Sequence, residues 1–215
     1  MNVINYQKKL DQLIASLKKE NRVPTVFLHS CCAPCSSYCL EYLAEYFHIT
    51  LLYYNPNIYP AEEYNHRVAE QRRLIDAMNE KVKYPIRFME GKFEPEKFFA
   101  MAKGLEKVPE GGERCYRCYE LRLREAAILA KEGGFDYFTT TLSISPLKNA
   151  QKLNEIGGEL EQEYGVSYLY SDFKKKNGYK RSTELSKEYD LYRQDYCGCV
   201  YSKAQRLEEM KERGE

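Results

Sequence analysis

The sequence contains no tryptophan, only three histidines and no long run of apolar residues. Apolar stretches such as residues 126–130 are far too short to cross a bilayer, which excludes a membrane-spanning chain. The histidines are dispersed without metal-ligand spacing, and there is no Ser-His-Asp arrangement, carboxylate pair or phosphate-binding glycine loop. Positive and negative residues almost balance, 33 against 32, so any contact with nucleic acid must come from a local patch.

The composition is that of a folded protein, with 43% hydrophobic and 30% charged residues, which excludes a disordered or collagen-like chain. The residues before Pro24 lack the apolar core of a secretory signal, so we expect a cytoplasmic protein with reduced thiols. A length of 215 residues favours a single domain over 1–215. Within it we expect an N-terminal helical extension over 1–22 and a tail over 171–215 that packs on the active-site face.

Hydrophobic periodicity predicts strands and helices in alternation. The predicted strands are residues 24–29, 49–54, 84–89, 135–141 and 166–170. The predicted helices lie within 1–22 and at residues 30–47 (after a turn), 61–79, 93–103, 115–131, 147–164, 182–189 and 202–213. Strands separated by helices favour parallel pairing through right-handed crossovers. We therefore predict an α/β fold with a doubly wound, mostly parallel five-stranded sheet and a helical, cysteine-containing C-terminal tail.

Eight cysteines are gathered in three short stretches, which in a reducing compartment is typical of a metal or redox site. The groups are Cys31, Cys32, Cys35 and Cys39; Cys115 and Cys118; and Cys197 and Cys199. Ligands of open α/β sheets bind at the carboxyl ends of the strands, and Cys31 and Cys32 directly follow the first predicted strand. The turn there has no glycine, which argues against a bound nucleotide phosphate. Chance packing is the alternative for this group, and we interpret Cys39 as a core residue.

The second pair, Cys115 and Cys118, is predicted to open a helix beside Arg114, a setting that lowers the pKa of a thiol. Together with Cys31 and Cys32 it offers four soft ligands, enough for tetrahedral zinc or for an iron–sulfur cluster. Cys197 and Cys199 are open to three interpretations: further metal ligands, a reversible dithiol that passes electrons, or plain packing.

Residues 172–181 carry five positive charges interleaved with Phe173 and Tyr179. The basic residues are Lys174, Lys175, Lys176, Lys180 and Arg181. They either form a solvated face or hold a nucleic-acid backbone while an aromatic ring stacks on an unpaired base. Ser143 and Ser145, after the fourth predicted strand, either bind ribose or phosphate or form a polar turn. His29, on an apolar strand, is interpreted as a hydrogen-bonded core residue.

Five blocks of the sequence resemble the epoxyqueuosine reductases of the QueH type, which do not use cobalamin. They are LHSCCAPCS at 28–36, YYNPNIYPAEEY at 53–64, RCYRC at 114–118 with the following Arg122, TTTLSISPLKN at 139–149, and FKKKNGYKRSTELSKEYDLYRQDYCGCVYS at 173–202. The resemblance implies an adenine-nucleotide-hydrolase-like sheet and the last step of queuosine formation, reduction of an epoxide on the modified wobble guanosine of tRNA. It also implies a [4Fe-4S] cluster with one additional iron ion. The implied partners are tRNAs with a GUN anticodon (Asp, Asn, His and Tyr acceptors) and an electron donor of the ferredoxin or flavodoxin type.

The roles that follow for single residues are hypotheses at this stage. Cys31, Cys32, Cys115 and Cys118 are the expected principal ligands, and Cys35 is the expected ligand of the second iron. Cys197 and Cys199 either complete the metal shell or relay electrons. The candidate proton donors are Asp195, Tyr196 and Tyr201, each of which has a structural alternative. Two other functions compete with reduction: a cluster-dependent tRNA thiolase, which would need ATP, and a zinc-stapled RNA-binding protein.

Overall fold

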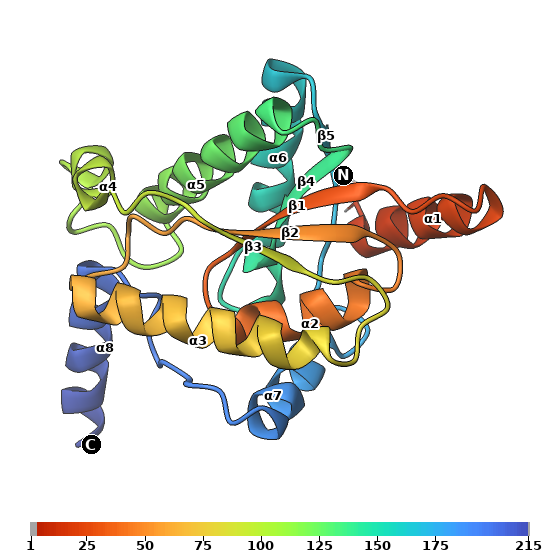
Figure 1. The fold of residues 1–215 in the computed structure, drawn as a ribbon. Coiled ribbons are helices and arrows are strands. Elements are labelled where there is room, and N and C mark those ends of the chain that lie inside the picture. The colour runs from red at the N-terminus through yellow and green to blue at the C-terminus, as the bar shows by residue number, and fades with distance from the viewer. Residues whose placement is uncertain (1–3, 215) are drawn as a thin grey trace.

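The computed structural model describes residues 4–214 and contains a twisted parallel sheet with helices on both faces (Figure 1). The sheet has five strands in the order β3-β2-β1-β4-β5, and all four pairings are parallel. The strands are β1 (Thr25–Ser30), β2 (His48–Tyr53), β3 (Arg87–Glu90), β4 (Tyr137–Thr140) and β5 (Ser167–Tyr168). The order reverses between β1 and β4, so the topological switch point lies at the ends of these two strands. The predicted doubly wound α/β fold is confirmed.

The helices cover the two faces of this sheet. They are α1 (Tyr6–Lys19), α2 (Ala33–Leu43), α3 (Ala61–Asn79), α4 (Pro95–Ala102), α5 (Glu113–Glu132), α6 (Ala150–Tyr164), α7 (Gly178–Glu188) and α8 (Val200–Arg213), with a 3₁₀ turn η1 (Thr141–Ile144). In Figure 1, α2 and α3 lie below the sheet and α5 and α6 above it. None of the helices in the described stretch is both long enough and apolar enough to cross a bilayer.

The central strand β1 explains why this sequence makes a two-faced core. Val26 and Leu28 pack into the hydrophobic cluster on the α2 and α3 face, whereas Phe27 packs into the cluster on the α5 and α6 face. All three are fully buried, as expected for a parallel strand covered on both sides. His29 continues this strand with no exposed surface, and its ring hydrogen-bonds to Thr140 Oγ1 (2.8 Å) and to the Tyr54 carbonyl (3.0 Å). Its interpretation as a core residue is confirmed.

The observed boundaries depart from the predicted ones where the chain approaches the carboxyl edge of the sheet. The helix predicted from residue 147 begins at Ala150, because η1 and the turn through Pro146 precede it and the Asn149 side chain caps it at Lys152 N (3.0 Å). The helix predicted from residue 182 begins at Gly178, after Asn177 in a left-handed conformation (φ 61°). β3 and β5, at the two edges of the sheet, are shorter than predicted.

The C-terminal part of the chain returns to the carboxyl edge of the sheet. α7 packs against α2, and α8 lies near the start of α3 (Figure 1). Between α7 and α8, residues 189–199 form a segment without helix or strand, which we call the strap. The Tyr59 amide donates a hydrogen bond to the Gly198 carbonyl (3.0 Å), so the end of the strap is joined to the loop that precedes α3.

Candidate functional site

Three thiols meet where β1 passes into α2. The sulfur atoms of Cys31, Cys32 and Cys35 all lie within 4.8 Å of one another, and the first two are 3.8 Å apart. Cys32 occupies the N-cap position of α2 in an extended conformation, and Pro34, which lacks an N–H group, fits the first helical turn. The local sequence therefore directs three sulfurs to one point. We call Cys31, Cys32 and Cys35 the turn group.

The turn group borders a cleft of about 420 Å³ at the carboxyl edge of the sheet. Two other segments supply walls of this cleft: Ser145 to Lys148 after η1, and Arg193 to Cys197 in the strap. Tyr179 and Ser182, on α7, also line it. The cleft thus lies where β1 and β4 end, the place that the topology predicts for a ligand.

Four other cysteines line a second, much smaller cavity next to the first. Cys115 and Cys118 come from the first turns of α5, and Cys197 and Cys199 come from the strap. We call these four residues the assembled group. Cys197 lines both cavities. Within residues 4–214 the turn group is the only compact set of three metal-ligating side chains, so the structure does not bring Cys115 and Cys118 into it.

All eight cysteines are free thiols, and their surroundings shift their pKa values in different directions. Hydrogen bonding to Cys31 and Cys35 holds the pKa of the Cys32 thiol well below its usual value, while the pKa values of Cys31 and Cys35 are raised. Cys32 is therefore the thiol of the turn group that loses its proton most readily. Cys39 has no exposed surface, lies in the core and donates to the Cys35 carbonyl (3.5 Å), as interpreted from the sequence.

The predicted lowering of thiol pKa values at the start of α5 is wrong. Burial raises the pKa of Cys115, and it raises that of Cys118 to about 12. The guanidinium of Arg114 donates to the carbonyls of Leu105 (2.9 Å) and Glu106 (3.0 Å). The cost of burying a charged thiolate therefore outweighs the stabilisation expected from the N-terminus of α5 and from the Arg114 charge.

Three buried or half-buried cations lie among the sulfurs, and sequence reasoning gave a role to none of them. Arg67 and Arg122 are each 1% exposed, and the Lys148 ammonium lies 3.2 Å from the Cys197 sulfur. Burial disfavours the charge on Lys148, yet Cys197, Tyr119 and Cys31 outweigh burial and hold its pKa well above the usual value. Lys148 and Arg122 occur in the sequence blocks quoted above, but nothing in the sequence showed that their charges would be buried.

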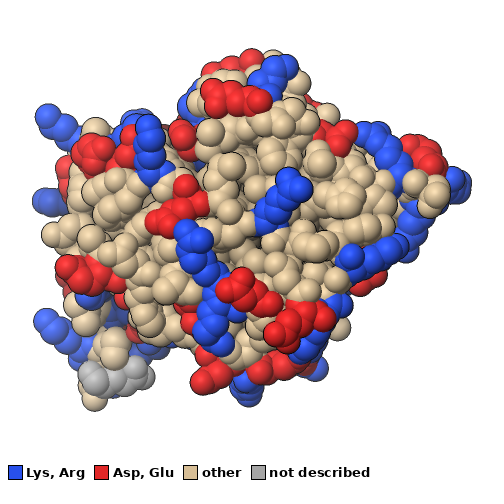
Figure 2. Space-filling model, viewed as in Figure 1, with Lys and Arg blue, Asp and Glu red and all other residues tan. Residues whose placement is uncertain are grey.

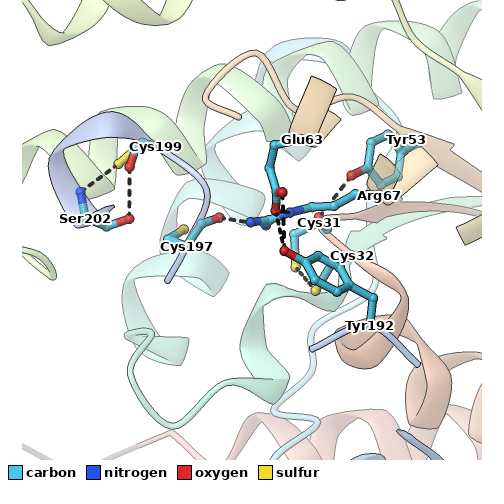
Figure 3. A network of polar contacts seen from close by, with 9 residues as sticks. All are labelled: Cys31, Cys32, Tyr53, Glu63, Arg67, Tyr192, Cys197, Cys199 and Ser202. Carbon is cyan, nitrogen blue, oxygen red and sulfur yellow. Dashed lines mark hydrogen bonds and ion pairs between the residues drawn. The ribbon is translucent and has the colours of Figure 1, made fainter. Parts of the chain in front are cut away.

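Figure 3 shows the polar contacts of Arg67 near Cys197. Its Nε donates to Glu63 (2.7 Å), and Nη1 donates to the Cys197 carbonyl (3.3 Å). Glu63 also accepts from the Tyr192 hydroxyl (3.3 Å), and Tyr53 donates to the Cys31 carbonyl (3.5 Å). A continuous polar network therefore joins α3 to the strap.

The candidate proton donors differ in their positions. Tyr196 lines the cleft, and burial raises the pKa of its hydroxyl, so the group keeps its proton at neutral pH. Asp195 also lines the cleft, but it is exposed and forms an ion pair with Arg206 (3.3 Å). Tyr201 does not line it; the Arg114 guanidinium lies over its ring at 4.6 Å.

Fewer side chains of the basic segment, residues 172–181, are available to contact a ligand than its composition suggested. Three of its five cations form ion pairs, and Phe173 is 1% exposed within the core and cannot stack on a base. The pairs are Lys174 with Asp172 (2.7 Å), Lys176 with Asp11 (2.7 Å) and Arg181 with Glu41 (2.6 Å). Lys175 and Lys180 are exposed and have no ion-pair partner among residues 4–214. Charges of both signs also alternate over the face in Figure 2.

The other residues predicted to contact the nucleic acid differ in how deeply they are buried. Ser143 is buried, and its hydroxyl accepts a hydrogen bond from the Phe173 amide (3.2 Å). Ser145 lines the cleft, and Tyr179, 43% exposed, lies on the same cavity. The structure therefore places Ser145 and Tyr179, but not the Ser143 hydroxyl, where a ligand in the cleft would reach them.

A parallel α/β sheet that carries a compact group of thiols beside a cleft at its switch point defines a class of protein with a cysteine-based metal or redox centre. Comparison with known sequences assigns the family. The family model described as epoxyqueuosine reductase QueH matches residues 26–205, and the chain belongs to this family.

Three relatives illustrate the similarity, and each is described as epoxyqueuosine reductase QueH. The protein from Staphylococcus epidermidis is 45% identical over 93% of this chain and 84% of its own length. The one from Streptococcus pyogenes is 44% identical over 93% of this chain and 78% of its own length. The protein from Thermotoga maritima is 36% identical over 87% of this chain and 95% of its own length.

Proposed function

We propose that this protein is an oxidoreductase that converts epoxyqueuosine to queuosine. The observation that carries the proposal is the turn group, three thiols at the edge of a cleft of about 420 Å³, in a chain of the QueH family. Two electrons and two protons turn the epoxide into an alkene, and the oxygen leaves as water. A buried group of soft ligands beside a cleft suits a metal centre that works on a bound substrate.

The donor set fits an iron–sulfur cofactor. Thiolates are the ligands that such clusters require, and the turn group already favours one thiolate at Cys32. We propose Cys31 and Cys32 as ligands of a [4Fe-4S] cluster, with Cys115 and Cys118 completing its shell from the neighbouring cavity and Cys35 holding an additional iron ion. The cluster would supply single electrons, and the iron would polarise the leaving oxygen.

The side chains of the cleft would orient the substrate and hold protons. Tyr196 lines the cleft and its hydroxyl keeps its proton at neutral pH, so we assign it the hydrogen bond to the departing oxygen. Asp195, which already accepts from Arg206, helps to hold this part of the strap and would return a proton from solvent. Cys197, on both cavities, and Cys199 would pass electrons or complete the metal shell.

We propose tRNA as the macromolecular partner, with the wobble nucleotide of GUN anticodons turned into the cleft. The modified base must leave the anticodon loop to reach the thiols, because Cys31 and Cys32 border the cleft but are buried. Tyr179 would stack on a neighbouring base, and Ser145 would contact ribose or phosphate. Lys175 and Lys180 would make the main contacts with the backbone. Lys174, Lys176 and Arg181, whose charges are already paired, would contribute less.

The electrons must come from another protein or a small reductant, since the chain offers thiols but no flavin or nicotinamide fingerprint. We propose a donor of the ferredoxin or flavodoxin class and a cytoplasmic setting, where tRNA and reduced thiols are both found.

One experiment tests the reaction directly. The chain is reconstituted with iron and sulfide without air and incubated with tRNA that carries epoxyqueuosine and with dithionite, and the nucleosides are read by mass spectrometry. We expect a brown protein and the loss of one oxygen mass from the modified nucleoside. A colourless zinc-loaded protein that leaves the nucleoside unchanged would contradict the proposal and favour the zinc-stapled RNA-binding protein.

A further inference from the structure

The strap, residues 189–199, carries Cys197 to the cleft without the support of a helix or a strand. Its backbone has positive φ angles at Asp190 (48°) and Gly198 (116°), so both ends of the segment turn sharply. A segment of this kind holds a sulfur in one place only if other parts of the chain fasten its backbone. The contacts with α3 are therefore decisive for the position of Cys197.

α3 contacts the strap through one face, on which Glu63, Arg67, Glu70 and Arg73 follow at helical spacing. The outer contact is made by Glu70 and Arg73. Glu70 accepts from the Tyr192 amide (2.8 Å), and Arg73 donates to the carbonyls of Tyr189 (2.9 Å) and Asp190 (3.0 Å). The Arg73 side chain is 48% exposed, so water competes for each of these hydrogen bonds.

The inner contact is made by Glu63 and Arg67, and the Arg67 side chain is 1% exposed. Glu63 fixes one edge of the Arg67 guanidinium at 2.7 Å, and the other edge donates to the Cys197 carbonyl at 3.3 Å. The ring of Tyr196 lies 5.3 Å from the guanidinium carbon. In Figure 3 the Arg67 guanidinium ends at the Cys197 carbonyl. The same planar group therefore joins Glu63 on α3 to the strap.

Close packing at Gly198 leaves the backbone no room beside Arg67. A Cβ atom at this glycine would lie 3.1 Å from Arg67 Nη1 and 2.9 Å from an Ile58 side-chain carbon. The Tyr59 amide also donates to the Gly198 carbonyl at 3.0 Å. The remaining nitrogen of Arg67, Nη2, is buried without a hydrogen-bond partner in the described part of the chain. A buried charge that is only partly satisfied is costly, which calls for a role beyond packing.

We propose that Arg67, oriented by Glu63, is a positioning residue that fixes the backbone at Cys197 and so keeps this thiol on the wall shared by the two cavities. Charge alone does not provide this function. A guanidinium donates to Glu63 and to the Cys197 carbonyl at once through its rigid fork, whereas an ammonium group cannot span both acceptors in the same geometry.

The test measures the reactivity of the Cys197 thiol in the full-length, metal-free chain. Samples are exposed to iodoacetamide under anaerobic conditions, and the alkylation of each cysteine is followed over time by peptide mass spectrometry. We expect Arg67→Met to raise the rate at Cys197 by about tenfold, the factor that corresponds to one lost charged hydrogen bond. The rate at Cys35, which belongs to the turn group, should change by less than about twofold. Arg67→Lys should resemble Arg67→Met.

Arg73→Met is the matched control, because it removes the exposed contact at the other end of the same strap. It should leave the rate at Cys197 unchanged, because water replaces the exposed hydrogen bonds that it removes. Tyr192→Phe removes only a hydroxyl contact with Glu63 on an exposed ring, so it should fold even if the Arg67 variants do not; it should raise the rate by about twofold. Urea unfolding curves show which variants are folded, and only the alkylation rates of those variants are compared.

Two results would overturn the proposal: an unchanged Cys197 rate in every folded variant of Arg67 and Tyr192, or an Arg67→Lys chain that behaves like the parent. Because the measurement uses no epoxyqueuosine, it is independent of the proposed reaction. A chain that fails to reduce the nucleoside would still show the Cys197 effect if Arg67 has this role.

Discussion

The two groups of cysteines are built in different ways. The turn group comes from five consecutive positions of the chain, and the passage from β1 into α2 sets its geometry. The assembled group takes two sulfurs from α5 and two from the strap, so it exists only when the C-terminal part of the chain has folded back. A site made within one turn depends on local backbone geometry, whereas a site made from distant segments depends on every contact that holds those segments.

The largest effect is expected from the turn group. Cys32→Ser should lower both the bound iron and the rate of epoxyqueuosine reduction by at least about 100-fold, because it removes the stabilised thiolate itself. Iron content and single-turnover reduction measure the loss. Cys39→Ala is the control, since this buried thiol lies on the same helix but in the core; it should keep its iron and cost about 1 kcal/mol of stability. A Cys32→Ser chain with full iron would show that the turn group is not the metal site.

The stability that the folded chain gains around His29, in the strand that leads into the turn group, should depend on pH. Burial and the neighbouring Arg122 charge lower the pKa of His29 from 6.5 to about 3. Below pH 6.5 the unfolded chain binds a proton that the folded chain does not accept, so stability falls as the pH falls towards 3, by about 1.4 kcal/mol per pH unit.

Urea unfolding at about pH 7, 6 and 5 compares the parent with His29→Gln, which cannot titrate. The stability difference between the two chains should shrink as the pH falls. If both chains lose stability in parallel, His29 does not set the pH dependence.

A smaller effect is expected in the assembled group, where Cys199 has a structural task of its own. Its sulfur accepts a hydrogen bond from the Ser202 amide (3.3 Å) and so caps α8. Cys199→Ala should therefore cost about 1 kcal/mol, whereas Cys199→Ser keeps an acceptor at the cap and should cost little. Urea unfolding separates the two variants. Equal losses would mean that the sulfur does not act through the cap.

The smallest effect is expected from two exposed cations in residues 172–181. The double variant Lys175→Ala and Lys180→Ala removes the two cations without ion-pair partners in residues 4–214, so the salt dependence of tRNA binding should weaken by a slope of about 2. Lys176→Ala, whose charge is paired with Asp11, is the control and should change the slope much less. Binding titrations at several salt concentrations measure both, and an unchanged slope in the double variant would contradict the assignment.

Much of the fold was predictable, because it depends on patterns that lie within single segments. The helix predicted at residues 61–79 is α3 with the same bounds, and the apolar run before His29 is β1 with a shift of one residue. The errors lie at the edges of the sheet and near the site. The extra turn η1 forms because residues 141–144 are buried at the switch point, a tertiary effect that helical periodicity does not record.

The part of the site that is formed by residues close together in the sequence could be predicted. The spacing of Cys31, Cys32 and Cys35 was enough to place three sulfurs together, whereas the lowered pKa expected for Cys115 failed because burial depends on the whole fold. For the same reason the basic segment looked freer than it is. Lys176 and Arg181 pair with Asp11 and Glu41, which lie far away in the sequence.

Cys197 lies on the wall between the cleft and the smaller cavity, within 3.2 Å of the Lys148 ammonium. A covalent adduct at this one sulfur would therefore intrude into both spaces at once and displace the neighbouring cation. A thiol-directed inhibitor aimed at Cys197 would therefore obstruct the cleft and the smaller cavity through a single covalent bond.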